Sequence, residues 1–484
     1  MIPVFYRCGK AWFKLMRKLE TAKRLILLGL AGIGLLLETA AFCYCWITNF
    51  SPSITNVTGV PYYYRAGLLE VALYALILYF LSNMYGGFRI GYLKNSEVVF
   101  SQVFATLAAN AIIYVELSIM AKQFFVLKMF VLMTIVQIII AIIWTNIAQV
   151  IYRNIFPPRK LLLIHGDREI DGILTKFAGR KDKYDIVQCM HVEMGMEEIS
   201  KEILTGLEGK EYHGVVIWDV STQERNEILK FCYGRSIRVY TMPKITDVIL
   251  LGAEELHLFD TPILLTREYS LSLEQRFVKR MIDVVCAGIL VVITSPIMLI
   301  TAIIIKAYDG GPVLYKQVRC TKDCREFEIM KFRSMRTDAE KDGVARLAQK
   351  NDDRITPIGK FIRKVRIDEL PQLINILRGD MSFIGPRPER PQIIEQYMEV
   401  MPEFAYRMKV KAGLAGYAQV YGKYNTTPYD KLKLDLTYIE NYSLWMDIQL
   451  MLLTLKILFW PDSTEGVESE QITALKAEMK KKKD

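Results

Sequence analysis

Residues 281–305 read MIDVVCAGILVVITSPIMLITAIII, an apolar stretch interrupted by Ser295 and Pro296. The stretch exceeds the roughly 20 residues that a helix needs to cross a bilayer. Proline lacks the backbone donor and clashes with the preceding turn, so we expect a break at Pro296, where the Ser295 hydroxyl can bond a freed carbonyl. A straight span and a re-entrant hairpin are both open. The hairpin fits better, because it keeps the charged residues after 305 on the side of entry.

Four further apolar runs of similar length precede residue 155. They lie near residues 25–50, 66–85, 98–120 and 125–150. Basic residues cluster before the first run and after the fourth: Arg7, Lys10, Lys14, Arg17, Lys18, Lys23, Arg24, Arg153, Arg159 and Lys160. The loop over residues 51–65 holds one basic residue. The positive-inside rule therefore predicts a four-span bundle with both ends in the cytosol.

The composition supports membrane segments joined to a soluble part. The chain of 484 residues has a net charge of +10, a mean hydropathy of +0.19 and 24% charged residues, which together exclude a disordered chain and an ordinary soluble enzyme. Glu38, Glu70 and Glu116 lie in or beside the apolar runs. They either join helices by hydrogen bonds or mark a path for ions or substrate.

The segment after the fourth run has the pattern of an α/β domain. LLLIH (161–165), VVIWD (215–219) and IRVYT (237–241) are typical of buried strands, with helical patterns between them. This alternation predicts a Rossmann-like parallel sheet. The first turn, HGDREI at 165–170, has one glycine where dinucleotide binding requires three, so a regulatory or oligomerisation module is favoured over a nucleotide site.

The sequence IDELPQLINIL (367–377) contains an adjacent pair of carboxylates, Asp368 and Glu369. Its apolar residues follow helical spacing, and Pro371 suits a first turn. The pattern predicts that Asp368 caps this helix, which places both carboxylates at its positive end. A plain capping pair would have the same sequence.

Cationic side chains surround the carboxylate pair in the sequence. They are Lys331, Arg333, Arg363, Lys364, Arg366, Arg378 and Arg387. Guanidinium groups fork onto phosphate oxygens, and no histidine follows residue 257 to act as a base. These residues favour phosphoryl transfer with a divalent cation, in which a carboxylate attacks phosphorus. A basic surface that binds anionic lipid heads is the alternative.

Over residues 270–462 the chain resembles the bacterial polyprenyl-phosphate hexose-1-phosphate transferases, which begin capsule and exopolysaccharide repeat units. The motifs that carry the resemblance are KFRSM, IGKFIRK, DELPQL, GDMSFIGPRPE and a GxxGxAQVxG segment. Four N-terminal helices followed by a Rossmann-like module are similar to the long form of this family. That form includes undecaprenyl-phosphate glucose and galactose phosphotransferases.

The resemblance implies a role for each site residue. Asp368 would attack the β-phosphate of a UDP-sugar, and Glu369 would bind Mg²⁺ or activate the incoming polyprenyl phosphate. Arg387, Arg363, Lys331 and Arg333 would hold phosphate or nucleotide. Ser295 and Pro296 would form the break of a re-entrant membrane hairpin. The family usually has glycines between residues 319 and 327, where Thr321 and Cys324 stand, and a Thr where Ala415 stands.

The expected protein is a multi-pass enzyme of the bacterial plasma membrane that transfers hexose-1-phosphate from UDP-glucose or UDP-galactose to undecaprenyl phosphate. Its expected parts are a four-helix transmembrane domain (1–155), a Rossmann-like domain (156–265), a re-entrant hairpin (266–308), a mainly α catalytic domain at the cytosolic face (309–462) and a basic tail (463–484). The expected partners are both substrates, Mg²⁺, membrane lipids and a second copy in a homodimer, with no nucleic acid. The rivals are a non-catalytic scaffold and a lipid flippase, for which the mostly apolar runs are unsuited.

Overall fold

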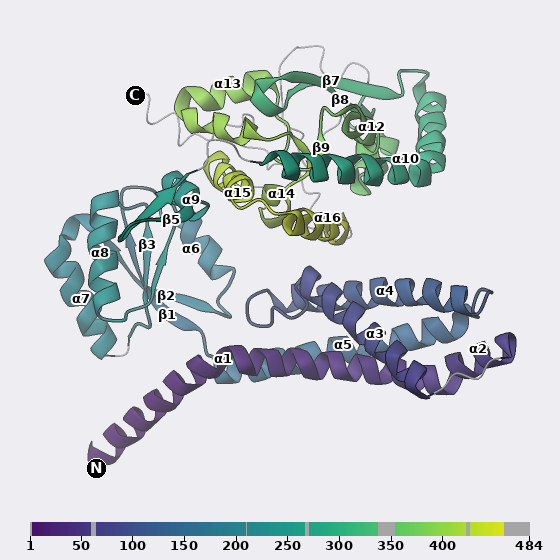
Figure 1. The fold of residues 1–484 in the computed structure, drawn as a ribbon. Coiled ribbons are helices and arrows are strands. Elements are labelled where there is room, and N and C mark those ends of the chain that lie inside the picture. Colours follow the sequence, from purple (N-terminus) through teal and green to yellow (C-terminus); the bar gives the residue numbers. More distant parts are fainter. Residues whose placement is uncertain are drawn as a thin grey trace. The chain divides into compact units, whose positions relative to one another are not determined.

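The structure is a computed structural model that describes residues 2–59, 64–209, 211–266, 271–336, 354–422 and 426–458. The chain divides into two compact units, Met1–Met242 and Pro243–Asp484, and each is described by itself (Figure 1). The expected basic tail (463–484) lies outside the described residues.

The first unit begins with a bundle of long apolar helices. They are α1 (Ile2–Cys45), a π-helical turn (Trp46–Phe50), α2 (Ser51–Thr58), α3 (Tyr64–Tyr85), α4 (Asn95–Met120) and α5 (Leu127–Ile155). Helix α1 packs against α3 and α5, and α4 packs against the same two helices (Figure 1). Four stretches of this bundle are long and apolar enough to cross a membrane. Together with α10 of the second unit, they make this a multi-pass membrane protein.

A hydrogen-bond network at the centre of the bundle joins its four long helices. Glu38 of α1 contacts Thr106 of α4 at 2.7 Å, and its backbone oxygen accepts from Gln137 of α5. Gln137 also donates to Tyr74 of α3, whose hydroxyl donates to Asn110 of α4. Because these polar groups form hydrogen bonds with one another, the network supports the interpretation that Glu38 joins helices rather than marks a path for ions or substrate.

A parallel four-stranded sheet follows the bundle in the first unit. Its order is β2-β1-β3-β4, formed by β1 (Arg159–His165), β2 (Tyr184–His191), β3 (Val215–Trp218) and β4 (Val239–Thr241). The connecting helices are α6 (Asp171–Ala178), α7 (Met196–Glu208) and α8 (Thr222–Gly234). Strands β1, β3 and β4 are the three strands expected from the sequence, and β1 and β3 have buried cores, whereas β4 is not fully buried. Strand β2 was not expected, because polar and apolar residues are mixed along it and only Met190 is fully buried.

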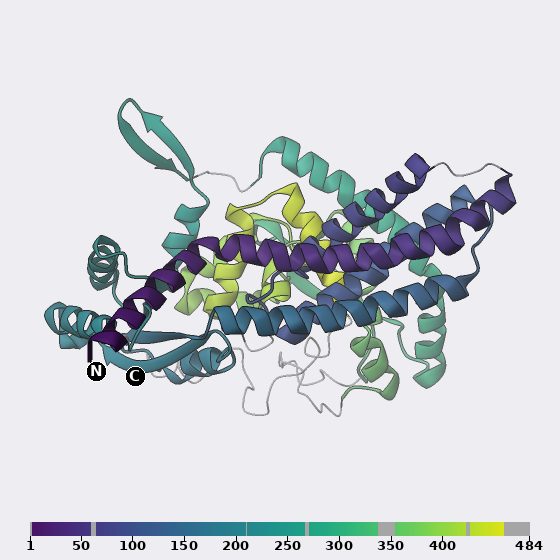
Figure 2. The same cartoon turned by 90° about the horizontal axis from the view of Figure 1, so that it is seen from below.

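The second unit begins with α9 (Ile245–Leu251) and a hairpin of β5 (Glu254–Leu258) and β6 (Thr261–Leu265). Every residue of both strands is exposed, and the hairpin projects from the helices of its own unit (Figure 2, teal). Helix α10 (Leu273–Asp309) comes next, followed by a second antiparallel hairpin, β7 (Leu314–Cys320) and β8 (Glu326–Phe332).

Short elements complete the second unit. They are a 3-10 turn (Lys322–Cys324), α11 (Pro357–Lys364), a 3-10 turn (Ile367–Glu369), α12 (Gln372–Arg378), β9 (Ser382–Ile384), α13 (Pro391–Val400), a 3-10 helix (Pro402–Lys409), β10 (Gly413–Ala415), α14 (Tyr417–Tyr421), α15 (Pro428–Glu440) and α16 (Leu444–Leu458). Strands β9 and β10 pair in parallel within one apolar core. This part is mainly helical, as the sequence predicts.

Helix α10 is one bent element. Ser272 caps its start, Pro296 lies inside it, and Figure 1 shows its ribbon turning sharply before β7. The Ser295 hydroxyl donates to Val292 O at 2.8 Å. That oxygen is the carbonyl left without an amide donor by Pro296, four residues later. The exposed apolar side chains around the bend, among them Val292 and Ile293, suit contact with lipid.

Polar contacts fix the first half of α10 to the rest of the second unit. Asp283 accepts from the backbone N–H of Phe383 at 2.9 Å, and Arg280 donates to two carbonyl oxygens at the end of α12. Lys279 forms a buried ion pair with Asp447 of α16 at 2.6 Å. The membrane helix and the soluble elements therefore form one packed body.

Candidate active site

Asp368 and Glu369 lie in the 3-10 turn that precedes α12. The turn is closed by the bond from Glu369 N to Arg366 O, and Arg366 has a left-handed backbone with φ of 55°. Helix α12 starts only at Gln372, with Pro371 at its cap position. The expectation that Asp368 caps this helix was therefore wrong. Tight i+3 bonds of the turn hold the pair one turn earlier in the chain.

Three cations surround the Glu369 carboxylate. Lys331 of β8 and Arg387 each lie 3.2 Å from its Oε1, and Arg366 lies 3.6 Å from its Oε2. Asp368 has no hydrogen bond or ion pair with any residue that the structure describes. The structure thus brings Lys331 and Arg387 to the carboxylate pair, and Asp368 has fewer polar contacts than Glu369.

The two neighbouring acids have pKa values moved in opposite directions. Burial, followed by the charge of Glu369, raises the pKa of Asp368. Burial alone would raise the pKa of Glu369 as well, but Lys331, Arg387 and Arg366 outweigh it and hold that pKa below its ordinary value. Glu369 is therefore a permanent anion. Asp368 is the more basic carboxylate, which is the property of the better nucleophile.

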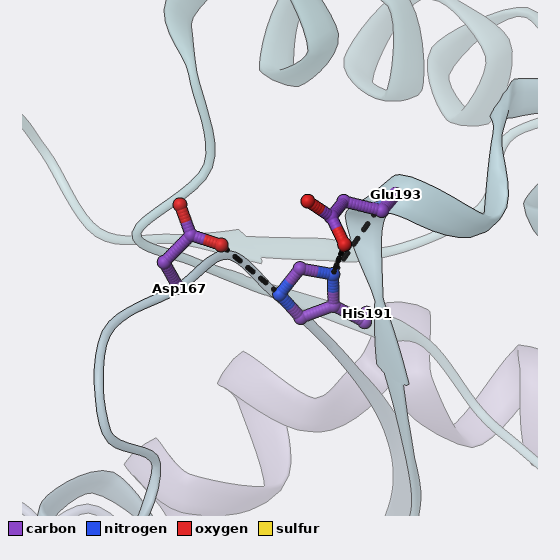
Figure 3. A group of neighbouring side chains, drawn as sticks. All are labelled: Asp167, His191 and Glu193. Atoms are coloured by element: carbon purple, nitrogen blue, oxygen red, sulfur yellow. Dashed lines mark hydrogen bonds and ion pairs between the residues drawn. The ribbon is translucent and has the colours of Figure 1, made fainter.

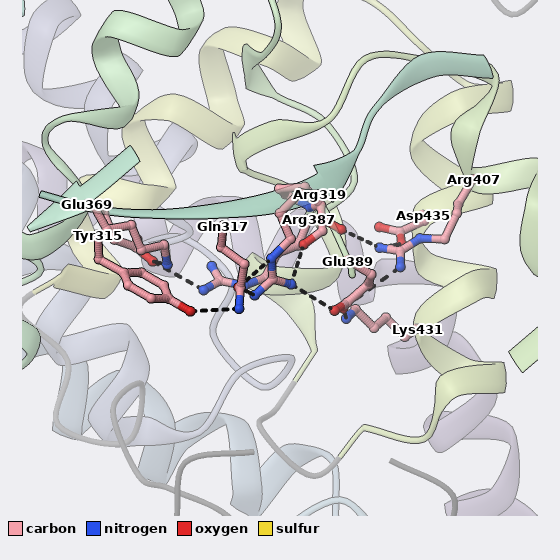
Figure 4. Close-up of polar contacts among 11 residues, drawn as sticks. Tyr315, Gln317, Arg319, Glu369, Arg387, Glu389, Arg407, Lys431 and Asp435 are labelled. Atoms are coloured by element: carbon pink, nitrogen blue, oxygen red, sulfur yellow. Dashed lines mark hydrogen bonds and ion pairs between the residues drawn. The ribbon is translucent and has the colours of Figure 1, made fainter. Parts of the chain in front are cut away.

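A second layer of charged residues supports Arg387 (Figure 4). Arg407 donates to the backbone oxygen of Arg387 at 3.0 Å and pairs with buried Asp435 at 2.8 Å. Glu389 pairs with Lys431 at 2.5 Å, and burial is outweighed by Lys431, Arg407 and Arg319, which hold the pKa of Glu389 at about 2. This network fixes the loop from which Arg387 reaches Glu369.

Arg319 of β7 connects this network to the hairpin. Its guanidinium donates to Gln317 and to Pro388 O, and Gln317 donates to the Tyr315 hydroxyl at 2.8 Å. Burial lowers the pKa of Arg319 to about 10. Sequence reasoning missed Arg319, Glu389, Arg407, Lys431 and Asp435. The first two stand in recognisable motifs, but the sequence has no signal that joins Arg407 to Asp435.

Two expected phosphate-binding residues lie outside the carboxylate cluster. Arg333 forms a bidentate ion pair with Asp309 at the end of α10, so its guanidinium is already engaged. Arg363 of α11 makes no ion pair with the carboxylates, although its charge lowers the pKa of Asp368. The arrangement separates Arg333, which joins α10 to β8, from Lys331 and Arg387, which contact Glu369.

The turn between β7 and β8 shows how the chain manages without the expected glycines. Asp323 and Cys324 take left-handed backbones there, with φ of 55° and 56°. The Thr321 hydroxyl donates to Asp380 O and accepts from Ala412 N. A non-glycine residue tolerates this conformation when its surroundings hold it, and Thr321 supplies two of those bonds.

The carboxylate pair is compatible with a hard divalent cation. Mg²⁺ prefers oxygen ligands and usually binds through one or two carboxylates together with substrate phosphates. Asp368 is unpaired among the described residues, and Glu369 Oε2 has only the 3.6 Å contact with Arg366. These two oxygens could hold the ion, whereas Oε1 is taken by Lys331 and Arg387.

The fold and the site define a membrane protein with a carboxylate pair set among cations suited to phosphate. Comparison with known proteins makes this class specific, because residues 274–461 match the family model described as bacterial sugar transferase. The chain belongs to this family.

Three similar proteins carry names of one kind. A UDP-N-acetylgalactosamine-undecaprenyl-phosphate N-acetylgalactosaminephosphotransferase of Aeromonas hydrophila is 44% identical over 38% of this chain and 44% of its own length. UDP-glucose:undecaprenyl-phosphate glucose-1-phosphate transferases of Escherichia coli (strain K12) and Caulobacter vibrioides are 38% and 39% identical. These matches cover 42% and 38% of this chain, and 43% and 71% of the relatives. The chain thus spans less than half of the first two relatives.

Proposed function

We propose that this protein transfers a sugar 1-phosphate from a UDP-sugar to undecaprenyl phosphate, as the first step of an exopolysaccharide or capsule repeat unit. One observation carries the proposal. In a member of the bacterial sugar transferase family, Asp368 stands beside a Glu369 that Lys331 and Arg387 hold as an anion. A non-catalytic scaffold would have no need to move the pKa values of two neighbouring carboxylates in opposite directions.

In the proposed mechanism the Asp368 carboxylate attacks the β-phosphorus of the UDP-sugar. The bond from that phosphorus to the bridging oxygen breaks, UMP leaves with that oxygen, and an aspartyl phosphosugar forms. A phosphate oxygen of undecaprenyl phosphate then attacks the same phosphorus and frees Asp368. Arg387 and Lys331 neutralise charge on the phosphates. Mg²⁺ bound by Asp368 and Glu369 would supply further positive charge on the diphosphate.

For the sugar, we propose only its class, a hexose or an N-acetylhexosamine carried by UDP. Relatives are named for glucose and for N-acetylgalactosamine, which differ at two positions of the ring. UDP-glucose and UDP-galactose were expected from the sequence, and UDP-N-acetylhexosamines join them as candidates. A panel of these donors, with UMP release as the readout, identifies the substrate.

We place the site on the cytosolic face of the plasma membrane, because UDP-sugars are made in the cytosol. Four crossings by the bundle return the chain to that face. The bend of α10, with Pro296 and the bond from Ser295 to Val292 O, then supports a hairpin that enters and leaves on one side. This topology keeps Asp368 beside its donor substrate and near the level of a lipid phosphate.

We also propose that the protein forms a homodimer through the β5–β6 hairpin. An isolated two-stranded hairpin is marginally stable in water, yet β5 and β6 are exposed throughout and carry Phe259 at the tip with 97% of its surface exposed. A second copy would cover this hairpin. Phe259→Asp should convert a dimer to a monomer in detergent, as measured by light scattering, whereas a parent protein that is already monomeric would contradict the dimer.

The decisive test of the mechanism is to trap the covalent intermediate. Parent protein given a sugar-labelled UDP-hexose without undecaprenyl phosphate should release about one UMP per active site and keep the label. Asp368→Asn should do neither, because an amide is a far weaker nucleophile. The matched control is Asp323→Asn, which changes an exposed acid of the β7–β8 turn. Normal UMP release by Asp368→Asn would refute the mechanism.

A further inference from the structure

Two neighbouring strands of the first unit end in the same pattern. Strand β1 ends at His165, with Asp167 two residues later, and β2 ends at His191, with Glu193 two residues later. The strands are parallel, and His165 and His191 are direct partners in their register. Two histidines and two acids therefore meet at the carboxyl edge of the sheet, beside the β1–β2 pair.

The side chains converge around the His191 ring (Figure 3). Asp167 Oδ1 lies 3.3 Å from Nε2 and Glu193 Oε2 lies 3.5 Å from Nδ1. One ligand atom from each of these three residues lies within 4.8 Å of the other two. The ring of His165 stands edge-on to that of His191, with 5.1 Å between their centroids. An ordinary ion pair would need only one of the two acids.

The backbone fixes the tautomer of His165. Its Nδ1 lies 2.9 Å from Gly166 O, and a carbonyl oxygen only accepts, so Nδ1 carries the proton. The lone pair is then on Nε2. Histidines that bind metals have this arrangement, in which one ring nitrogen donates to a backbone carbonyl and the other is left for the ion.

The spacing between His191 and Asp167 also suits a metal. Two ligands held about 2.0–2.1 Å from a tetrahedral zinc ion lie about 3.4 Å from each other. The distance from His191 Nε2 to Asp167 Oδ1 is 3.3 Å. A mixed set of imidazole and carboxylate favours zinc and similar transition metals over Mg²⁺ or Ca²⁺, which prefer oxygen alone.

We propose that this edge of the sheet is a binding site for a divalent transition metal of the zinc type. His165 Nε2, His191 Nε2 and the Asp167 carboxylate are the protein ligands, and water completes the tetrahedron. Without metal, His191 Nδ1 accepts from Glu193 N at 3.3 Å, so Nε2 carries the proton. On binding, the ion takes the place of that proton, which moves to Nδ1; the bond from Glu193 N to Nδ1 is then lost, and Nδ1 donates to the Glu193 carboxylate instead.

The site is independent of the proposed transferase chemistry, because it lies in the first unit and shares no residue with the carboxylate cluster. Its ligands come from the ends of two strands, so the ion would tie β1 to β2. Bound metal should therefore raise the melting temperature of the first unit, as any ligand of the native state does.

The test uses the full-length protein in detergent, stripped of metal with a chelator and titrated with Zn²⁺ by calorimetry. The parent should bind one Zn²⁺ at this site with micromolar affinity. His191→Gln and Asp167→Asn should each weaken that binding at least tenfold. Asp167 is 92% exposed, so its replacement leaves the fold intact. The matched control is His257→Gln, which changes an exposed histidine of β5.

Co²⁺ gives a second readout, since a tetrahedral site with nitrogen and oxygen ligands has a visible absorption band. That band should be present in the parent and in His257→Gln, and absent in His191→Gln. Unchanged Zn²⁺ affinity in both Asp167→Asn and His191→Gln overturns the proposal, because the ion is then held elsewhere. Absence of Zn²⁺ binding at micromolar concentration in the parent overturns it as well.

Discussion

At the scale of single residues, the three cations around Glu369 decide the protonation of the site. Lys331 is the largest of the charges that lower the pKa of Glu369, and it also lowers the pKa of Asp368. Its loss should raise both pKa values, because an anion without its counter-charge binds a proton more readily. The fall of activity at low pH, the acid limb of the pH profile, therefore depends on a residue of β8 that is far from the carboxylates in sequence.

Lys331→Met should lower kcat/KM about 100-fold and move the acid limb of its pH profile up by about 1 pH unit. UMP release measured from pH 5 to 9 checks both effects. The matched control is Lys316→Met, which removes an exposed lysine paired with Glu328 on the same hairpin and should leave the profile unchanged. An acid limb at the parent position in Lys331→Met would show that Lys331 does not act on the carboxylates.

Glu389 supports the fold through its charge. Its pKa of about 2 lies below that of the unfolded chain, so its stabilising effect is present above about pH 4.5 and is lost as the pH falls toward 2. Glu389→Gln should lower the free energy of unfolding by about 3 kcal/mol at pH 7, since each pKa unit corresponds to about 1.4 kcal/mol. Chemical denaturation of both proteins measures this difference, and Glu328→Gln, at an exposed site, is the control.

The loss caused by Glu389→Gln should shrink as the pH is lowered from 5 toward 2, because the parent then loses the same charge. Equal denaturation midpoints for Glu389→Gln and parent at pH 7 would contradict the assignment of a stabilising role to this carboxylate.

At the scale of elements, the sequence predicted the long apolar helices and most strands of the α/β sheet, because both have a clear hydrophobic pattern. The apolar runs became α1, α3, α4, α5 and α10, and the three expected strands became β1, β3 and β4, of which β4 is not fully buried. The sequence failed to predict two elements that lack a clear pattern of their own. Only Met190 of β2 is fully buried, and the 3-10 turn at Asp368, preceded by the left-handed backbone of Arg366, takes the place of the expected helix cap.

The same limit applies to the site. Asp368, Glu369, Lys331 and Arg387 were predicted from motifs, and they meet in space. Arg333 stands two residues from Lys331, a spacing that would place both side chains on one face of a continuing strand, but β8 ends at Phe332 and Arg333 pairs with Asp309 instead. The sequence has no signal for the end of β8 at Phe332, which is what separates the two cations.

The bend of α10 can be tested by removing its cause. Ser295→Ala with Pro296→Leu restores the amide donor to Val292 O and should favour a straight helix that crosses the membrane. Tyr308→Cys, in a protein without its native cysteines, introduces a thiol at an exposed position near the end of α10. An impermeant reagent added outside the cell should label position 308 in the double variant and not in the protein with its native bend. Labelling of the latter from outside would refute the hairpin.

At the scale of the whole molecule, the charged residues of the proposed chemistry lie in the second unit. The Caulobacter relative aligns over 71% of its length with 38% of this chain, so most of that protein corresponds to this region. A fragment of residues 243–484 should therefore release UMP within about tenfold of the parent rate per inserted molecule. It keeps α9, which packs against α15, and Gly252, which lies against Glu440.

A fragment of residues 271–484 lacks α9 and serves as the comparison, with lower thermal stability expected. An inserted, folded 243–484 fragment without turnover would show that residues before 243 complete the site.

The network around Glu38 has a consequence for the order in which the chain is made. Glu38 enters the membrane with the first helix, but Thr106 is synthesised 68 residues later and Gln137 99 residues later. Until then a carboxyl group in hydrocarbon has no partner from α4 or α5, a state that is costly for an isolated helix. We therefore expect the first helix to be held less stably in the membrane until the helices that carry these partners have been made. A ribosome-bound chain arrested before α4 should therefore be extracted from the membrane more readily than one arrested after α5.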